Sequence, residues 1–490
     1  MAALVAAIPA DVLDRRIDPP GHTPHDGTAP PVVDLTHDSR QVGRGWAFVC
    51  IPGDTVDGHD FAPAAVAQGA SVIIVERPLD LPVPQIVVTD ARRAAGPAAA
   101  VVHGSPANRL DLIGVTGTNG KTTVTHMLAA VLAAVGRDVE QVGTLSGVRT
   151  TPEAADLQRS LAGFVADGID TVVMEVSSHA LALHRVDGCR FDVSVFTNLS
   201  QDHLDLHGSM EAYFRAKALL FEPALSDLGV VNRDDTFGRL LTDAAPIEMR
   251  TYSSEDASDV RVGVREHRFT WRGHDVVVPV GGTFNVSNSL AALTASVELG
   301  IDAGAAVAGL AGCPPIPGRF EHVSGPGDDI DVVVDYAHTP DGIAALIDAL
   351  RDVADGRVVL VFGCGGERDA DKRSLMGAAA TAADVVVVTS DNPRREDPDA
   401  IIAAAVAGVD RSGSDHRYRD ALIIDADRRR AIRAAIDVAL PGDVVAIAGK
   451  GHETTQTIGL ESLPFDDRVE ARAGLERRRH DGECSVGAAT

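Results

Sequence analysis

The stretch GVTGTNGKTT at 114–123 has the residue types of a phosphate-binding loop. In such a loop, backbone N–H groups and the N-terminus of the following helix surround an anion, and a lysine adds a point charge. Gly117 and Gly120 permit the tight backbone path that this arrangement requires. We expect Lys121 to reach the β- and γ-phosphates of a nucleotide and Thr122 to hold Mg²⁺.

The loop is shorter than the common pattern G-x-x-x-x-G-K-[ST], because Val115 stands where that pattern has its first glycine. A plain glycine turn before a helix is the alternative interpretation. An apolar run precedes the loop and a helix-like run, VTHMLAAVLAAV, follows it. The order of strand, loop and helix favours a nucleotide site.

Three further stretches of the same region carry polar or charged residues that could belong to the nucleotide site. The apolar run TVVME ends in Glu175, and an acid at the end of a neighbouring strand is where the Mg²⁺ of a nucleotide finds a carboxylate. The stretch TNLSQDHLDLHG offers Asn198, Asp202, His203 and Asp205, although a polar loop that caps a helix explains it equally well. A predicted helix, AYFRAKALLFE, carries Lys217, to which spacing alone assigns no role.

Two stretches near the C-terminus combine groups that suit an amino acid. The segment DNPR offers Asp391, Asn392 and Arg394, and GKGHE offers Gly449 and Glu453. An arginine fork suits a carboxylate and a glutamate suits an ammonium, so together they would hold both ends of a zwitterion. Solvated charges at the edge of a sheet are the alternative interpretation.

Two other chemistries are poorly supported. The GCGG stretch at 363–366 lacks the third glycine of G-x-G-x-x-G, which argues against a dinucleotide site, and Cys364 is interpreted as a small packed residue. Ser177 and His179 lie close in sequence, but no G-x-S-x-G elbow surrounds them, which argues against a hydrolase.

The elements that must position these residues predict an α/β fold. In the last third of the chain, four apolar runs rich in valine alternate with helix-like segments, which predicts a parallel, doubly wound sheet. Each run is followed by an unusual polar stretch: YAHTP, GCGGERD, SDNPRRED or GKGHE. Ligands bind beyond the carboxyl ends of parallel strands, so we expect all four stretches to line one ligand-binding edge.

The length of 490 residues predicts several domains. We place the boundaries at the linker-like stretches HGSPANR and GPGDD, which gives a first domain at 1–106, a nucleotide-binding domain with a parallel sheet at 107–325 and a C-terminal doubly wound, Rossmann-like domain at 326–490. The first 30 residues and the tail beyond about residue 470 are expected to be poorly ordered.

Composition restricts the partners and the compartment. The formal net charge of −26 disfavours nucleic acids and anionic membranes. The five scattered cysteines indicate neither a disulfide framework nor a zinc site, which favours a reducing compartment. No signal peptide and no apolar run long enough to span a membrane is found, so we expect a cytoplasmic protein, with a monomer favoured.

These pieces, in this order, resemble the Mur ligases of peptidoglycan synthesis. The resemblance covers nearly the whole chain and rests on about a dozen ordered stretches: DSR and DGHDF, then GVTGTNGKTT, TTP, MEVSSHAL, TNLSQDHLDLHG, YFRAK and GTFNVSNSLAA, then PGRFE, VDYAHTPDG, FGCGGERD, TSDNPRRED and AGKGHE. The short phosphate loop is itself typical of this family. The stretch DNPR resembles the family's signature for meso-diaminopimelate.

The resemblance implies three domains and an ATP-dependent carbon–nitrogen ligase. In such a reaction ATP phosphorylates a carboxylate of the substrate, and an amine then displaces the phosphate. The implied reaction adds meso-diaminopimelate to the D-glutamate carboxylate of UDP-N-acetylmuramoyl-L-alanyl-D-glutamate, with both substrates small molecules. The implied cofactors are ATP, Mg²⁺ and a CO₂-derived carbamate on Lys217.

Site residues carried over by position fall into five groups. Catalytic roles are implied for Lys121, His203 and Lys217. Mg²⁺ would be held, directly or through water, by Thr122, Glu175, His203 and the carbamate of Lys217. ATP would contact Gly117, Thr118, Asn119, Gly120, Lys121, Thr122, Thr123, Asn288, Arg319 and Asp335. The UDP-linked substrate would contact Ser39, Asp54, Thr55, Val56, Thr150, Thr151, Ser177 and Arg185, and the amino acid would contact Arg373, Asp391, Asn392, Pro393, Arg394, Gly449 and Glu453.

Two positions depart from the family's pattern, and three other functions stay open. Leu183 stands where some relatives have a substrate-binding glutamine, and the side chains of DTV at 54–56 differ from those of some relatives. A ligase like folylpolyglutamate synthase shares the phosphate loop and the activated carboxylate. A P-loop switch or motor ATPase would hydrolyse the nucleotide without an amino acid and usually has a basic patch. A nucleotide-binding module without catalysis would leave the metal-site acids and Lys217 without a task.

Overall fold

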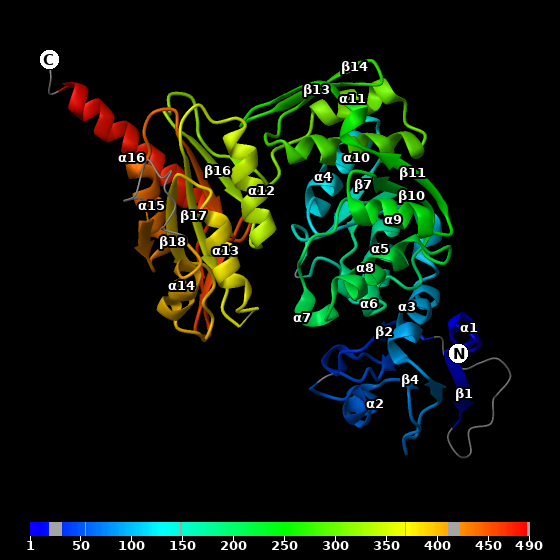
Figure 1. Ribbon diagram of the computed structural model, residues 1–490. Coiled ribbons are helices and arrows are strands. Elements are labelled where there is room, and N and C mark those ends of the chain that lie inside the picture. Colours follow the sequence, from blue (N-terminus) through cyan, green and yellow to red (C-terminus); the bar gives the residue numbers. More distant parts are fainter. Residues whose placement is uncertain (19–31, 54, 148, 368, 410–421, 488–490) are drawn as a thin grey trace. The chain divides into compact units, whose positions relative to one another are not determined.

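The structure, a computed structural model, describes residues 1–18, 32–53, 55–147, 149–367, 369–409 and 422–487. Figure 1 shows its helices and strands in the order of the chain. The chain forms two compact units. The first unit comprises residues 1–117, 136–197 and 206–251. The second comprises residues 118–135, 198–205 and 252–490.

The N-terminal part of the first unit is a five-stranded sheet. Its order is β1 (Leu13–Ile17), β5 (Gln85–Val88), β4 (Val72–Val75), β3 (Ala47–Val49) and β2 (Leu35–Thr36), in which only β1 is antiparallel to its neighbour. The helices are α1 (Ala2–Ala7), α2 (Ala62–Gln68) and α3 (Ala91–Val102). The expectation of poor order is wrong for α1 and β1, while residues 19–31 lie outside the described residues.

The same unit contains the central six-stranded sheet. Its order is β11 (Glu248–Tyr252), β10 (Ser226–Asn232), β9 (Phe191–Phe196), β6 (Asp111–Thr116), β8 (Thr171–Glu175) and β7 (Val139–Val142). The strands from β10 to β7 are parallel. Strands of parallel sheets are covered on both faces, which is why β6, β8 and β9 are almost continuously apolar and buried. The helices of this region are α5 (Ala154–Ala166), α6 (Ser178–Ala182), α7 (Leu204–His207), α8 (Met210–Ala218) and α9 (Thr236–Ala244).

In the second unit, α4 (Lys121–Ala134) packs against α10 (Phe284–Glu298) and α11 (Ala303–Ala311). The approach of α11 to α4 is close enough to require glycine: a Cβ on Gly309 would lie 2.8 Å from the Cα of Val131. A three-stranded antiparallel sheet accompanies these helices, formed by β12 (Ser258–Val262), β13 (His267–Trp271) and β14 (His274–Val278).

The C-terminal part of the second unit is a doubly wound sheet, as predicted. Its order is β15 (Glu321–His322), β16 (Asp331–Asp335), β20 (Val444–Ala448), β17 (Val358–Cys364), β18 (Val385–Ser390) and β19 (Leu422–Asp425). All strands from β16 to β19 run parallel, and only β15 is antiparallel. The four valine-rich runs of the sequence are β16, β17, β18 and β20.

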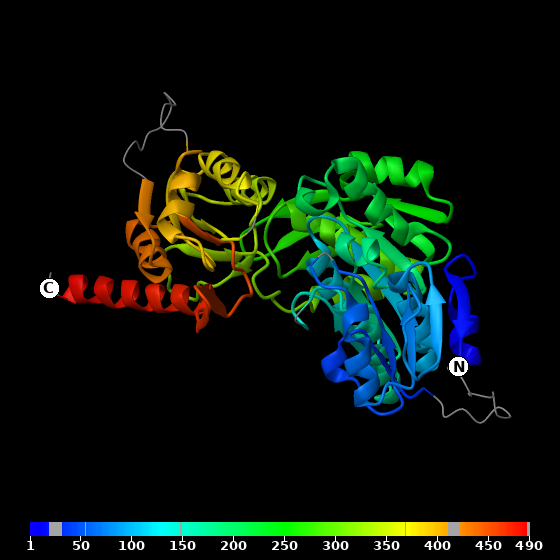
Figure 2. The same cartoon turned by 90° about the horizontal axis from the view of Figure 1, so that it is seen from below.

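Helices cover both faces of this sheet (Figure 2). One apolar core contains side chains of α12 (Pro340–Arg351), α13 (Lys372–Ala380) and α14 (Pro398–Val406). The core on the other face contains side chains of α15 (Arg428–Val438) and α16 (Asp467–Gly487). A hairpin of β21 (Thr455–Ile458) and β22 (Glu461–Pro464) connects β20 to α16.

The expectation of a frayed tail is wrong. The α16 helix continues to Gly487, and its residues Ala471 and Leu475 are buried in the core beside Ile432 and Ile436 of α15. The segment is rich in arginine and poor in apolar residues, so its few buried positions were not recognised as a packing face.

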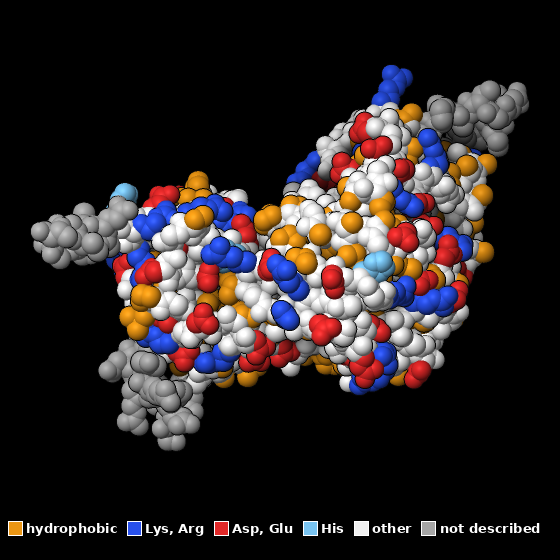
Figure 3. All heavy atoms as spheres, turned by 90° about the horizontal axis from the view of Figure 1, so that it is seen from above, with side chains coloured by type: hydrophobic (Ala, Val, Ile, Leu, Met, Phe, Trp, Pro, Cys, Tyr) orange, Lys and Arg blue, Asp and Glu red, His pale blue; other side chains and the backbone are white. Residues whose placement is uncertain are grey.

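The surface mixes charges of both signs. Lysine and arginine side chains are interspersed with aspartate and glutamate side chains on the face shown in Figure 3. Among the described residues, none of the helices combines the length and the apolar character that a membrane span requires.

A buried ion pair joins α15 to α16. Nε and Nη2 of Arg428 each donate to the Asp467 carboxylate at 2.7 Å, and both side chains are fully buried. Nη2 of Arg428 also donates to the carbonyl of Ala448 at 2.9 Å, and Nη1 donates to that of Ser390 at 3.5 Å. These carbonyls belong to the last residues of β20 and β18, so Arg428 ties together the strand ends that carry GKGHE and DNPR.

Replacing Arg428 by methionine should lower the free energy of unfolding of the second unit by about 3–5 kcal/mol, because Asp467 would stay buried without its cation. Urea denaturation measures this loss. The matched control is Arg430→Met in the same helix, which removes an exposed pair with Asp425 and should cost about 1 kcal/mol or less. Equal losses in the two variants would contradict the assignment.

Candidate active site

The phosphate loop has the predicted local structure. It links the end of β6 at Thr116 to the start of α4 at Lys121. Gly117 and Gly120 have φ values of 149° and 85°, which are strained for residues with a side chain. Nζ of Lys121 donates to the carbonyl of Thr118 at 2.8 Å, so the lysine folds back over its own loop.

A second loop, which begins at Asn198 after β9, holds the phosphate loop in place. Asn198 accepts from the backbone N–H of Thr118 at 2.8 Å with its carbonyl and from that of Asn119 at 3.0 Å with its side chain. The backbone N–H of Ser200 donates to the hydroxyl of Thr118 at 3.0 Å. Since β6 and β9 are adjacent, their carboxyl ends bring the two loops together. Sequence reasoning noted Asn198 but did not foresee this supporting role.

Two of the predicted nucleotide contacts, Arg319 and Asp335, lie close to the helix end of the loop. Nη2 of Arg319 donates to the hydroxyl of Thr122 at 3.2 Å, and its guanidinium lies 4.2 Å from the ring centroid of Tyr336. The Asp335 carboxylate accepts from the backbone N–H groups of Phe320 and Ala337, both at 2.7 Å. Burial raises the pKa of Asp335, and Arg319 and these two hydrogen bonds oppose the rise.

The predicted contact Asn288 lies on α10. Its side-chain amide donates to Asn285 at 2.8 Å, and Asn285 in turn donates to the carbonyl of Gly281 at 2.6 Å. Both asparagines are buried.

Lys217 is the clearest case in which the structure adds to the sequence. It is 1% exposed, and its Nζ donates to the carbonyl of Gly117 at 2.7 Å and lies 4.7 Å from the ring centroid of Tyr213. Spacing alone assigned this lysine no role, yet the structure places it against the first glycine of the phosphate loop. Buried lysines are rare, because an ammonium is costly to remove from water.

Glu175, at the end of β8, is 2% exposed and accepts from the backbone N–H of Thr144 at 2.8 Å and from its hydroxyl at 3.2 Å. The hydroxyl of Thr151 donates to the backbone carbonyl of Glu175 at 2.8 Å. The same hydroxyl accepts from the backbone N–H of Ser177 at 3.1 Å. Arg185 donates to the carbonyl of Thr151 at 3.3 Å. Three predicted contacts to the UDP-linked substrate thus gather around Glu175.

The other predicted contacts to that substrate are Thr150, Ser39 and residues 54–56. The hydroxyl of Thr150 lies 3.1 Å from that of Thr144. Ser39 lies in a short 3₁₀ helix, and Thr55 and Val56 are exposed. Asp54 lies outside the described residues.

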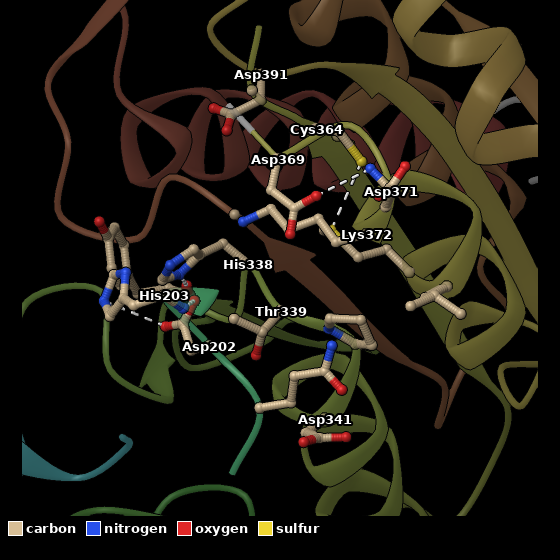
Figure 4. A pocket seen from close by; sticks show the side chains of 18 of the residues that line it. Asp202, His203, His338, Thr339, Asp341, Cys364, Asp369, Asp371, Lys372 and Asp391 are labelled. Carbon is tan, nitrogen blue, oxygen red and sulfur yellow. Dashed lines mark hydrogen bonds and ion pairs between the residues drawn. The ribbon is translucent and has the colours of Figure 1, made fainter. Parts of the chain in front are cut away.

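The four polar stretches after β16, β17, β18 and β20 converge, as predicted. They line a cavity of about 500 Å³ at the carboxyl ends of these strands (Figure 4), together with residues 201–204. Six predicted site residues lie in its wall: His203, Asp391, Asn392, Arg394, Gly449 and Glu453.

Arg394 is held by backbone contacts on both sides. Its own N–H donates to the carbonyl of Thr457 at 3.1 Å, its carbonyl accepts from Gly459 at 2.6 Å, and its Nη1 donates to the carbonyl of Gly366 at 2.7 Å. Its φ of 52° is unusual for a residue with a side chain. The hairpin formed by β21 and β22 therefore fixes the backbone of the arginine predicted to bind a carboxylate.

The neighbouring predicted residues form a polar network. Nδ2 of Asn392 donates to Oε2 of Glu453 at 2.8 Å, and Lys450 donates to the same oxygen at 2.8 Å. Burial alone would raise the pKa of Glu453, but Lys450 and Asn392 outweigh burial and the pKa is lowered. Burial raises the pKa of Asp391, against the opposing charges of Arg428 and Lys450.

Arg373 and Pro393, also predicted contacts of the amino acid, are not among the residues that line the cavity. Arg373 is buried and pairs with Glu396 at 2.9 Å, and it donates to the carbonyl of Gly365 at 3.3 Å. Pro393 approaches Gly366 so closely that a Cβ on that glycine would lie 1.9 Å from the proline carbonyl oxygen.

Sequence reasoning gave no individual role to Lys372 and His338 of the cavity, and it offered Asp202 only as part of the TNLSQDHLDLHG stretch. Lys372 extends from α13 across the cavity toward His338 and Asp202 (Figure 4). Burial alone would raise the pKa of Asp202, but the charges of His203, His338 and Lys372 outweigh burial and lower it. Burial, with a contribution from Lys372, lowers the pKa of His338. The position of His338 directly after β16 was the available signal, since every such stretch was expected at this edge.

Three family models match consecutive parts of the chain. The Mur ligase family catalytic domain matches residues 32–113, the Mur ligase middle domain residues 115–296, and the Mur ligase glutamate ligase domain residues 318–451. The chain belongs to the Mur ligase family. The predicted family, and with it the three-domain α/β fold, is confirmed.

Curated relatives cover nearly the whole chain. A UDP-N-acetylmuramoyl-L-alanyl-D-glutamate–2,6-diaminopimelate ligase from Geobacillus thermodenitrificans is 45% identical over 486 residues, which are 94% of this chain and 98% of the relative. The ligase of the same name from Gloeobacter violaceus is 45% identical over 476 residues, 92% of this chain and 95% of the relative.

Solved structures agree with this fold. A structure of a UDP-N-acetylmuramoyl-L-alanyl-D-glutamate–2,6-diaminopimelate ligase has a TM-score of 0.65 and 35% identity, covering 92% of this chain and 96% of that one. A folylpolyglutamate synthase from Mycobacterium tuberculosis, complexed with ADP and AMPPCP, has a TM-score of 0.59 at 21% identity, covering 72% of this chain and 92% of that one, and shares the fold alone.

The predicted Mg²⁺ ligands belong to different units. Glu175 and Lys217 lie in the first unit, and Thr122 and His203 lie in the second. The metal site stays a prediction, as do the roles of the individual site residues and the domain boundaries.

Proposed function

We propose that this chain adds meso-diaminopimelate to the D-glutamate carboxylate of UDP-N-acetylmuramoyl-L-alanyl-D-glutamate, using ATP and releasing ADP and phosphate. The observation that carries the proposal is the cavity at the C-terminal sheet edge, whose wall contains Arg394 and Glu453. It supports an amino-acid substrate in a chain 45% identical to ligases named for that reaction.

The reaction requires activation of an unreactive group. A carboxylate repels nucleophiles and has no good leaving group, so one of its oxygens first attacks the γ-phosphorus of ATP and displaces ADP. The amine then attacks the carbonyl carbon of the acyl phosphate, loses a proton, and expels inorganic phosphate as the amide forms. The phosphate released carries the oxygen that the carboxylate contributed. Charge develops on phosphoryl oxygens in both steps, which is why cations and N–H donors are needed.

The phosphate loop supplies these donors. The N–H groups at the start of α4 and Lys121 suit the β- and γ-phosphates, while the loop at Asn198 accepts from the N–H groups of Thr118 and Asn119 and so supports the backbone path. Arg319 donates to Thr122 and adds a second cation at this end of α4. Asp335 and Asn288 are proposed to contact the ribose and the base.

Mg²⁺ is proposed to be held by Thr122, Glu175 and a carbamate on Lys217, with His203 acting through water. Hydroxyl and carboxylate oxygens are the ligands that Mg²⁺ prefers, which fits the first three positions better than the imidazole nitrogen of His203. When bound, the ion neutralises charge on the phosphoryl oxygens. A carbamate forms when the neutral amine of lysine adds CO₂ and releases a proton. It would turn a costly buried ammonium into a further oxygen ligand.

Selection of the amino acid is proposed to rest on the C-terminal cavity. Arg394 would pair with the distal carboxylate that diaminopimelate has and lysine lacks, while Glu453 and Asp391 would receive an ammonium. With lysine, Arg394 would stay desolvated and unpaired, a penalty of roughly 2–5 kcal/mol. Arg373, Asn392, Pro393 and Gly449 would complete this subsite.

The UDP-linked substrate is proposed to bind in the first unit. Thr151, Ser177 and Arg185 form a connected polar cluster there. Thr150 would extend this cluster, while Ser39 and residues 54–56 would meet the uridine end.

The enzyme is proposed to act in the cytoplasm as a monomer. The cysteines that the structure describes, Cys50, Cys189, Cys313 and Cys364, are free and buried, which suits a reducing compartment. A ligase like folylpolyglutamate synthase stays the second candidate within ligases, favoured by the shared fold and disfavoured by the DNPR stretch. A switch or motor ATPase is disfavoured by the cavity, since nucleotide hydrolysis alone needs no second subsite.

Phosphate release from ATP should depend on both UDP-N-acetylmuramoyl-L-alanyl-D-glutamate and meso-diaminopimelate. An enzyme-coupled phosphate assay with each substrate omitted in turn measures this dependence. Lysine in place of diaminopimelate should lower kcat/KM by about 30-fold or more, the lower bound of the 2–5 kcal/mol penalty.

The Arg394→Ala variant is the control for selectivity, and it should bring the two amino acids within a few fold of each other. Equal use of lysine by the unmodified chain would remove the selectivity claim and leave the ligase claim. Phosphate release without any amino acid would contradict the ligase itself.

Lys217→Ala should reduce kcat by about 100-fold or more, since it would remove a proposed Mg²⁺ ligand. Short carboxylates such as formate or acetate should restore part of the activity by taking the place of the carbamate. Carbon-13 NMR after equilibration with labelled bicarbonate should show a carbamate carbon in the unmodified chain and lose it in the variant. Unchanged turnover, or the same carbamate signal in both proteins, would rule out the role of Lys217.

A further inference from the structure

The chain contains only four lysines, against forty arginines. Lys121 and Lys217 belong to the phosphate loop and the proposed metal site, and Lys372 lines the cavity. The fourth, Lys450, touches residues of the cavity wall, although nothing in the proposed reaction requires it. Lysine is thus an uncommon cation in this chain, and its compact ammonium fits a different set of acceptors from the planar fork of arginine.

Lys450 lies two residues beyond the end of β20 and is 0% exposed. Its Nζ lies 2.8 Å from Oε2 of Glu453, 3.2 Å from Oδ1 of Asn392 and 3.6 Å from Oδ1 of Asp391. All three acceptors belong to residues proposed to hold the amino acid. Lys450 is therefore a buried cation shared by three groups of one subsite.

The ammonium determines the orientation of the Asn392 amide. Oδ1 of Asn392 accepts from Lys450 and from the backbone N–H of Thr457 at 2.9 Å, which leaves Nδ2 to donate to Glu453. Rotation of the amide by 180° would place an NH₂ group against two donors and an oxygen against a carboxylate. Without Lys450, one of the two donors that oppose this rotation would be gone.

Lys450 also controls how much of Glu453 is available to a ligand. Oε2 accepts both hydrogen bonds that the side chains of Asn392 and Lys450 donate to this carboxylate. Within the part of the chain that the structure describes, Oε1 accepts none. One oxygen of Glu453 is thus engaged, and the other is left for a ligand.

Acids outnumber cations among the buried charges beside Lys450. Three carboxylates, Asp391, Glu453 and Asp467, lie close to two cations, Arg428 and Lys450. Burial raises the pKa of Asp391, and the charges of Arg428 and Lys450 oppose that rise. Removal of Lys450 would leave more of this acidic charge uncompensated and change the electrostatic environment that the ammonium of a ligand meets.

We propose that Lys450 is a positioning residue of the amino-acid subsite, which holds Glu453 and Asn392 so that one carboxylate oxygen is presented to one ammonium. The inference rests on the proposed function and specifies how its amino-acid subsite is built. Arginine should not take this place, because three acceptors lie within 3.6 Å of the single atom Nζ, which suits a tetrahedral ammonium and not a planar fork.

Lys450→Met should raise the KM for meso-diaminopimelate at least tenfold, with kcat changed less than threefold and the KM for ATP unchanged. Lys450→Arg should raise the same KM, although it keeps the charge. The matched control is Arg357→Met, which removes a partly buried cation paired with Asp443 at the opposite, amino-terminal ends of β17 and β20. This control should lower the melting temperature and leave all KM values as they are.

The pH dependence separates positioning from a loss of stability. Among the interactions that lower the pKa of Glu453, the one with Lys450 is the largest, and His452 acts in the same direction. Asp391 and Arg428 also face this carboxylate. In Lys450→Met the pKa of Glu453 should rise. The acid limb of kcat/KM for the amino acid should then move to higher pH, because a protonated Glu453 no longer attracts an ammonium. The acid limb in Arg357→Met should not move.

The two proposals fail in different ways. If the unmodified chain releases no phosphate in response to any amino acid, the proposed function is wrong. If the unmodified chain responds to diaminopimelate and Lys450→Met keeps its KM and its pH profile, the positioning role is wrong. An equal rise in the KM values for all three substrates would also overturn it, since that pattern marks a general structural defect.

Discussion

Charge that is buried must be compensated, and this constraint determines how the C-terminal sheet edge is built. Acids lie at the ends of three parallel strands, and each has a cation in contact or close by: Arg319 beside Asp335, and Lys450 beside Asp391 and Glu453. An uncompensated carboxylate there would protonate or would destabilise the fold. In the proposed amino-acid subsite, Glu453 and Asp391 would receive the ammonium of the substrate.

At the phosphate loop, the charge to be compensated is the negative charge of the proposed nucleotide. A chain with a net charge of −26 repels nucleotides over most of its surface, so the attraction must be local. Backbone N–H groups, the N-terminus of α4 and Lys121 concentrate positive potential in a few residues, and Asn198 keeps those residues in one conformation. The proposed activation of a carboxylate depends on this concentration, because both partners in the first step are anions.

Much of this arrangement could be predicted from the sequence. Strands of a parallel sheet are buried on both faces and read as continuous apolar runs, and their carboxyl ends share an edge, so four distant polar stretches could be assigned to one cavity. The two glycines of the phosphate loop were equally readable, because their backbone conformation excludes most other residues.

The remaining features depend on contacts that have no local signature. Arg428 and Asp467 are 39 residues apart and look like ordinary surface charges in the sequence, yet they form a buried pair. Lys217 looks like a solvated helical lysine, and only its contact with Gly117 shows otherwise. The helical tail was missed because a few buried residues, Leu475 among them, hold a segment that is otherwise strongly charged.

The most direct test of the account follows one atom. The D-glutamate carboxylate of UDP-N-acetylmuramoyl-L-alanyl-D-glutamate is labelled with oxygen-18, and the phosphate formed in the complete reaction is examined by phosphorus NMR or mass spectrometry. Formation of an acyl phosphate requires one labelled oxygen in each phosphate released. Unlabelled phosphate, formed together with the amide product, would contradict activation of the carboxylate by phosphorylation.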